Sequence, residues 1–324
     1  MSVLVFAENW DGKFKKSTYE AISYGSEIAK QVGGNVTAIV IGNVSDDDMK
    51  SLGKYGAQKI LSVKNDKLNS LNPSAFASAI AQASQKESAK MVLLSYTYSG
   101  KSVAGRVAVK LKAGLVAGAT SLPSSVSPFT VRKKCFSGKG LTDVVISSDI
   151  KVIGITPNSF HIDNGEGSAS IEIFSPSFTD ADFNSTSKET KKTSGKIALT
   201  EAEIVVSGGR GMKGPENWGM IEQLAELLGA ATACSKPVAD MGWRPHHEHV
   251  GQTGITIGPN LYIAIGISGA IQHLAGVNSS KVMVVINSDK EAPFFKAATY
   301  GICGDAFEVV PKLIEEVKKF KEHH

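Results

Sequence analysis

A glycine-rich turn and a helix start, close together in the sequence, carry the residues best suited to binding chemistry. The turn is Val250-Gly-Gln-Thr-Gly254, and a buried strand then leads to a helix that opens on Ser268-Gly269-Ala270. Backbone N–H groups at a helix start have no helical partners and form an anion site. Gln272 and His273 fall on the first turn of that helix, where their side chains can reach a bound ring system. The pattern predicts an anionic ligand that carries a ring.

A second glycine loop follows the strand predicted at 204–207. Its Gly209-x-Gly211-x-x-Gly214 spacing matches the dinucleotide fingerprint between a strand and a helix, although a sharp structural turn needs the same glycines. A nicotinamide site also needs a carboxylate after the next strand, predicted at 230–234. That strand ends in Ser235-Lys236-Pro237, which contains no acid. The sequence therefore argues against NAD.

A flavin requires hydrogen-bond donors near N5 and O4, and positive potential near N1 and O2. Thr253 can donate to one edge, and Lys236 and His273 can supply the other. A single Thr in a turn, or a single His on a helix, usually has a structural role. Their joint occurrence beside an anion-binding helix start favours a flavin.

Other polar residues allow two interpretations. Asn287 and Asp305 fall near predicted carboxyl ends of strands, where ligands bind in an open α/β sheet, but each can equally cap a turn. The run from His246 to His249 suggests a metal site, yet adjacent loop residues rarely converge on one ion. A solvated loop is the preferred interpretation of that run. No catalytic residue and no metal ligand is predicted.

The elements around these residues alternate between strands and helices, which predicts an α/β fold with mostly parallel sheets flanked by helices. In the first half, strands are expected at 2–7, 36–41, 59–63 and 91–95, with helices that end at Gly33-Gly34, begin at Asn72-Pro73 and span 102–111. Shorter strands at 129–136, 143–147, 151–155 and 170–174 suggest an antiparallel extension. The second half predicts a doubly wound, Rossmann-like domain with later strands at 262–267, 282–286 and 307–310.

Two domains suit a chain of 324 residues. Residues 175–196 are rich in Ser, Thr, Lys and Asp and cannot bury enough apolar surface to fold alone. We expect an N-terminal α/β domain at 1–174, a linker at 175–200, and a cofactor-binding domain at 201–324.

Composition limits the class of partner and the compartment. The net charge of +4 is small and its basic and acidic residues are interspersed, which argues against a nucleic-acid ligand. Cys135, Cys234 and Cys303 lie far apart, which fits a reducing compartment. The sequence shows neither a targeting leader nor a membrane-spanning apolar run, so a cytoplasmic, bacterial protein without membrane insertion is expected.

These motifs together resemble the electron-transfer flavoprotein alpha subunit, over nearly the whole chain and most strongly from Ile204 to Pro311. The resemblance implies FAD in the C-terminal domain and a heterodimer with a beta subunit. It also implies an N-terminal domain that has an adenine-nucleotide-hydrolase-like fold, binds no nucleotide and contacts the partner subunit.

The resemblance also implies roles for particular residues. Arg210 and Ser235 match FAD contacts, Thr253 matches the hydroxyl near N5, and His273 matches the residue near O2. Lys236 departs from the usual Arg, which keeps the charge but loses the planar guanidinium and bears on the flavin potential. The remaining predicted cofactor-binding residues are Val250, Gln252, Gly254, Ser268, Gly269, Ala270, Gln272, Asn287 and Asp305.

The resulting hypothesis is an electron carrier without substrate turnover of its own. It takes electrons from acyl-CoA dehydrogenases of fatty acid β-oxidation and from other flavin dehydrogenases, and passes them toward a membrane quinone oxidoreductase. Three alternatives remain: an NAD(P)-dependent dehydrogenase, a nucleotide-binding regulatory module, and an electron-bifurcating member of the same family.

Overall fold

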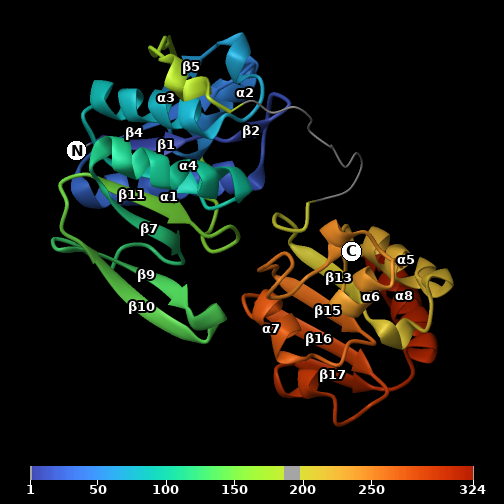
Figure 1. The fold of residues 1–324 in the computed structure, drawn as a ribbon. Coiled ribbons are helices and arrows are strands. Elements are labelled where there is room, and N and C mark those ends of the chain that lie inside the picture. The colour runs from blue at the N-terminus through green and yellow to red at the C-terminus, as the bar shows by residue number, and fades with distance from the viewer. Residues whose placement is uncertain (1, 186–197, 324) are drawn as a thin grey trace. The chain divides into compact units, whose positions relative to one another are not determined.

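The computed structural model describes residues 2–185 and 198–323. It divides into two compact units: 1–135 with 140–192, and 136–139 with 193–324 (Figure 1). The predicted linker at 175–200 lies outside the described residues over 186–197. Its described beginning is bonded to helix α3 (Pro73–Lys86) and its cap, since Gln82 donates to the Ser177 carbonyl and the capping Asn72 donates to that of Ser185.

The first unit contains a ten-stranded sheet in the order β10-β9-β7-β11-β6-β1-β4-β5-β12, with β8 paired to β9. Alternate residues of β1 point to opposite faces. Val3 and Val5 pack on the face covered by α1 (Lys16–Val32), whereas Leu4 and Phe6 pack on the face covered by α3 and α4 (Tyr98–Leu111). The strands are β1 (Ser2–Phe6), β4 (Asn35–Ile41), β5 (Lys59–Val63), β6 (Ala89–Ser95), β7 (Gly114–Ala119), β8 (Ser125–Val126), β9 (Phe129–Cys135), β10 (Gly140–Ile146), β11 (Lys151–Ile155) and β12 (Ser170–Ile173).

Local signals explain the helix ends of this unit. Gly33 ends α1 in the left-handed conformation, with φ of 62°. The Asn72 side chain accepts from the backbone N–H groups of Ser74 and Ala75 and so caps α3, as its Asn-Pro start predicts. The remaining elements are α1 (Lys16–Val32), α2 (Asp46–Ser51), α3 (Pro73–Lys86), α4 (Tyr98–Leu111), a small hairpin of β2 (Asn9–Trp10) and β3 (Lys13–Phe14), and the 3-10 turns η1 (Leu52–Tyr55), η2 (Asp66–Leu68), η3 (Phe136–Gly138) and η4 (Asp180–Phe183).

The expected antiparallel extension is only partly correct. β9 and β10 are antiparallel, but β11 pairs parallel with both β6 and β7, and β12 pairs parallel with β5 at the opposite edge of the sheet. Short strands without long helices between them do not reveal their direction. Strand β7 and the hairpin of β2 and β3 were not predicted.

The second unit is a doubly wound, five-stranded parallel sheet in the order β14-β13-β15-β16-β17 (Figure 1). One face packs against α5 and α8, and the other packs against α7 and the loops around Val250 and Phe294. Its elements are β13 (Ile204–Gly208), α5 (Gly219–Leu228), β14 (Ala231–Cys234), α6 (Lys236–Asp240), β15 (Leu261–Ile265), α7 (Ile271–Val277), β16 (Val282–Asn287), β17 (Tyr300–Cys303), α8 (Ala306–His323), and the 3-10 turns η5 (Arg210–Met212), η6 (Pro215–Asn217), η7 (His246–Glu248) and η8 (Pro293–Lys296).

The last predicted strand, at 307–310, is wrong. These residues form the start of α8, and the edge strand is β17, immediately before it. The side chain of Asp305 accepts from the backbone N–H of Phe307 at 2.9 Å and so favours a helix start. The short apolar run from Phe307 to Val310 is compatible with either element.

Candidate functional site

A pocket of about 560 Å³ lies at the carboxyl edge of the second sheet. Strands β14 and β15 flank β13 on opposite sides, so the loops after β13 and β15 diverge there. Such a switch point is the usual ligand position in an open α/β sheet. The pocket is lined by residues that follow β13, β14, β15 and β16, and by the turn around Gly251.

The Val250–Gly254 turn is held from two sides. The Val250 N–H donates to the Cys234 carbonyl at the end of β14, and the Gln252 N–H donates to the Gln272 carbonyl on α7 at 2.7 Å. A Cβ on Gly276 would lie 2.5 Å from the backbone of Gly251. The turn and α7 therefore approach backbone to backbone, and glycine is required at that crossing.

The glycine loop after β13 packs closely against the loop after β15, and its Arg210 and Gly211 line the pocket. The Gly211 N–H donates to the Gly266 carbonyl at 3.0 Å, and a Cβ on Gly209 would lie 2.1 Å from that oxygen. The chain then forms two 3-10 turns, η5 and η6, before α5 begins at Gly219. The expected order of strand, turn and helix is confirmed, with the helix beginning only after these two turns, and the glycines permit close contact with the loop after β15.

Two cations line the pocket. Arg210 is exposed on η5, and Lys236 is the first residue of α6, directly after Ser235. Lys236 forms an ion pair with Asp240, one helical turn further along. The amino end of α6 carries partial positive charge, so this corner of the pocket favours an anion.

His273 is buried on α7, and its Nε2 atom lies 2.8 Å from the Tyr262 hydroxyl. With that hydroxyl as donor, the neutral ring carries its proton on Nδ1. Burial, with a smaller contribution from His249, lowers the pKa of His273 to about 4. A backbone hydrogen bond with Val250 opposes this shift without reversing it. An imidazole that is neutral at pH 7 therefore forms part of the pocket wall.

His249 also lines the pocket, although it was not predicted as a site residue. Its ring lies against the turn, because a Cβ on Gly254 would lie 2.7 Å from its Nδ1 atom. Burial, followed by the charge of Lys236, lowers its pKa.

The expected solvated loop at 246–249 is correct for the exposed His246 and His247 and wrong for the last two residues. Glu248 is buried in a two-bond ion pair with Arg244, at 2.7 Å for each bond. Arg244 in turn lies over the Trp218 ring, which ties this loop to the core of the unit. The run from His246 to His249 drew attention to a possible site, but adjacent positions in a loop gave no indication that His249 turns toward the pocket.

Twelve of the fourteen residues predicted from the sequence line this pocket: Arg210, Ser235, Lys236, Val250, Gln252, Thr253, Ser268, Gly269, Ala270, Gln272, His273 and Asn287. Gly254 belongs to the same turn without lining it. Asp305 does not line it either; it caps α8 and lies 3.7 Å from the Lys213 ammonium group. Asn287 caps a turn, because its Oδ1 atom accepts from the Asp289 N–H at 3.0 Å, and it also lines the pocket. Asp289, which was not predicted, also lines the pocket.

Among the described residues, no three His, Cys, Asp or Glu side chains are grouped so that they could hold a metal ion. Within the same part of the chain, no helix has the length and apolarity needed to cross a membrane.

Comparisons with known proteins identify the class to which this fold and pocket belong. Residues 3–179 match the electron transfer flavoprotein domain, and residues 198–278 match the electron transfer flavoprotein FAD-binding domain. The chain is 38% identical to the electron transfer flavoprotein subunit alpha of Syntrophomonas wolfei, over 97% of this chain and 98% of that protein. It is 36% identical to the subunit alpha of Bacillus subtilis, over 99% of this chain and 98% of that protein. It is 32% identical to Protein FixB of Clostridium saccharobutylicum, over 98% of this chain and 96% of that protein.

The chain therefore belongs to the electron transfer flavoprotein alpha-subunit family, and its cofactor is FAD. The pocket fits that cofactor. Its lining includes two cations, Arg210 and Lys236, that suit a negatively charged cofactor, glycines open the backbone around the turn, and His273 places a neutral imidazole in the wall.

Proposed function

We propose that this chain pairs with a beta subunit and carries electrons between other flavoproteins, with FAD held in the pocket of the second unit. FAD, when bound, supplies one-electron and two-electron transfer. The chain's own residues bind it, orient it and set the charge around its ring. The names of the relatives, electron transfer flavoprotein subunit alpha, support this role.

The observation that carries the proposal is the arrangement around the Val250–Gly254 turn. Thr253 and Lys236 line one pocket together with the buried His273. We infer that Thr253 donates to the N5 side of the flavin ring, and that Lys236 and His273 stabilise negative charge at the opposite edge. This distribution of donors suits electron transfer through a flavin.

The finer assignments remain part of the proposal. We infer that acyl-CoA dehydrogenases and other flavin dehydrogenases supply the electrons, and that a membrane quinone oxidoreductase accepts them. We infer also that the cofactor-binding unit moves toward its partners, and that the protein works in the cytoplasm. The N-terminal unit would provide the interface with the beta subunit.

A direct test is to purify the complex of this chain with its beta subunit and record its visible absorbance. A yellow complex that releases FAD on denaturation is expected. A colourless complex without releasable FAD would contradict the proposal. Replacement of Lys236 by Met should then lower the flavin midpoint potential while FAD stays bound, whereas Lys290→Met, outside the pocket, should leave the potential unchanged.

Two alternatives are separated by simple measurements. An NAD(P)-dependent dehydrogenase is disfavoured because β14 ends at Cys234 and is followed by Ser235 and Lys236 rather than a carboxylate. Titration of the complex with NADH should therefore show no binding by this chain. An electron-bifurcating form, in keeping with the similarity to Protein FixB, would contain two flavins in the heterodimer instead of one. Counting the flavins released per heterodimer distinguishes these forms.

A further inference from the structure

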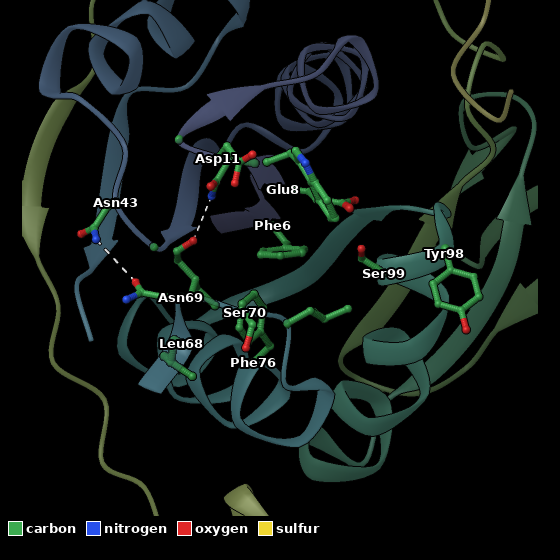
Figure 2. A pocket seen from close by; sticks show the side chains of 16 residues that line it. Phe6, Glu8, Asp11, Asn43, Leu68, Asn69, Ser70, Phe76, Tyr98 and Ser99 are labelled. Carbon is green, nitrogen blue, oxygen red and sulfur yellow. Dashed lines mark hydrogen bonds between the residues drawn. The ribbon is translucent and has the colours of Figure 1, made fainter. Parts of the chain in front are cut away.

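A second pocket, of about 710 Å³, lies in the first unit at the carboxyl edge of its sheet (Figure 2). Strands β4 and β6 flank β1 on opposite sides, so the loops after β1 and β6 diverge there. This is the second switch point of the molecule, and its volume lies within the range of small-molecule sites. The proposed electron carrier does not use it.

The floor of this pocket is apolar and aromatic. Phe6, from the end of β1, meets Phe76, from α3, edge to face with ring centroids 6.0 Å apart. Ile41 and Leu68 complete the floor, and all four side chains are buried. A flat ring is the ligand shape that packs best on such a surface.

The rim carries neutral hydrogen-bonding groups on the side opposite Tyr98 (Figure 2). The Asn43 amide donates to Asn69 at a long 3.4 Å, and both side chains are exposed. Ser70 stands beside them, and Ser99 lies at the start of α4. Amides and hydroxyls of this kind can recognise the edge of a heterocycle and the hydroxyls of a sugar.

Glu8 brings a carboxylate to the pocket. Its Oε2 atom accepts from the Thr97 hydroxyl at 2.6 Å, and the oxygen of Thr97 accepts from the Gly100 N–H at 3.0 Å. This chain's own carboxylate therefore stands beside the amino end of α4, where a ligand phosphate would otherwise bind. The lining, all of it described, includes Glu8 and Asp11 but no Lys, Arg or His.

We propose that this pocket binds an uncharged nucleoside and rejects the corresponding phosphate. The base packs on Phe6 and Phe76, and the carboxylate of Glu8 accepts from ribose hydroxyls, as acidic residues do in other sites at a switch point. A phosphate at the same position meets the negative charge of Glu8 without a compensating cation in the lining.

The test is calorimetric titration of the FAD-loaded heterodimer with adenosine and, separately, with AMP. A saturating excess of free FAD occupies the flavin site, so neither probe can bind there. Absence of adenosine binding would therefore contradict the nucleoside pocket without bearing on the proposed electron carrier. We expect saturable binding of adenosine and at least tenfold weaker binding of AMP at this pocket.

Three variants of the chain assign the signal. Ser70→Trp fills the pocket from an exposed position and should abolish adenosine binding, while Gln85→Trp, exposed on α3 outside the pocket, should leave it unchanged. Glu8→Gln keeps a side chain that can bond Thr97 but removes the charge. It should therefore reduce the preference for adenosine over AMP by on the order of tenfold.

The proposal is overturned by any of three results: adenosine fails to bind, its binding survives Ser70→Trp, or AMP binds at the Ser70-dependent site as tightly as adenosine. Any AMP bound by the beta subunit is unaffected by Ser70→Trp, so the difference between the heterodimers with and without this change reports on this pocket alone.

Discussion

At the scale of single residues, His273 couples the pocket to pH. Its pKa is about 4 in the folded chain, compared with 6.5 for an ordinary histidine, because the ring is buried. The unfolded chain therefore binds more protons between these two values. The stabilising contribution of the neutral ring is complete above about pH 6.5 and is lost as the pH falls toward 4.

We predict that the free energy of unfolding of the FAD-free chain falls more steeply with acidification in the wild type than in His273→Gln. The difference should approach about 1.4 kcal/mol per pH unit between pH 6 and 5. Urea unfolding at a series of pH values measures it. His249→Gln is the matched comparison. The pKa of His249, on the neighbouring turn, is also lowered, so its replacement should also make the free energy of unfolding less dependent on pH. Equal slopes for the wild type and His273→Gln would show that His273 is not held neutral by folding.

The sequence predicted most residues of the flavin pocket because turn and helix-start chemistry is local. Thr253, Ser268 and Gln272 lie within one short stretch, and their types alone indicate what they can donate. His249 and Asp289 were missed because their approach to the pocket depends on how distant segments fold against each other. The inward turn of His249 depends on the buried pair of Arg244 and Glu248, which periodicity does not reveal.

At the scale of elements, the crossing of α7 over the Val250–Gly254 turn fixes the geometry of the site. A methyl group on Gly276 would lie 2.5 Å from backbone atoms of Gly251, which cannot move without shifting the turn. We predict that Gly276→Ala destabilises the protein by about 1–3 kcal/mol and weakens FAD binding, because the turn that carries Thr253 is displaced. Denaturant unfolding and FAD titration measure the two effects.

Gly219→Ala is the control for that change. Gly219 is also helical, at the start of α5, but a Cβ there would have nothing within 4 Å. Its replacement should leave FAD affinity unchanged and alter stability by less than about 1 kcal/mol, in the stabilising direction. If Gly276→Ala behaved like this control, the close backbone approach would not be what positions the turn.

Elements whose ends are marked by glycine, proline or a capping residue were predicted well, and elements without such residues were not. Gly33 and the pair Asn72-Pro73 mark helix ends through backbone geometry that few other residues satisfy. The direction of β11 and β12 was predicted wrongly because it is determined by partner strands that are distant in the sequence. The start of α8 was mistaken for a strand because four apolar residues fit either period.

At the scale of the whole molecule, the two units have separate sheets and separate hydrophobic cores. The predicted division into two domains rests on composition, which changes sharply around 175–196, and on the restart of the alternating pattern after it. Composition gives the number of domains more readily than the position of their boundary. The described residues 177–185, for example, are mostly polar, yet Phe178 and Phe183 pack against the core of the first unit and Ser177 is bonded to Gln82 of α3.

Because the two units have separate hydrophobic cores, we predict that they unfold in separate transitions. In scanning calorimetry, the chain should show two transitions, and an excess of FAD should raise the temperature of one of them only. At a free concentration of 100 times Kd, the stabilisation should be about 2.7 kcal/mol, because FAD binds the folded second unit and not the unfolded one. Arg210→Ala, in the flavin pocket, should reduce this shift and leave the other transition in place. A single transition that FAD moves as a whole would instead mean that the two cores unfold as one cooperative body.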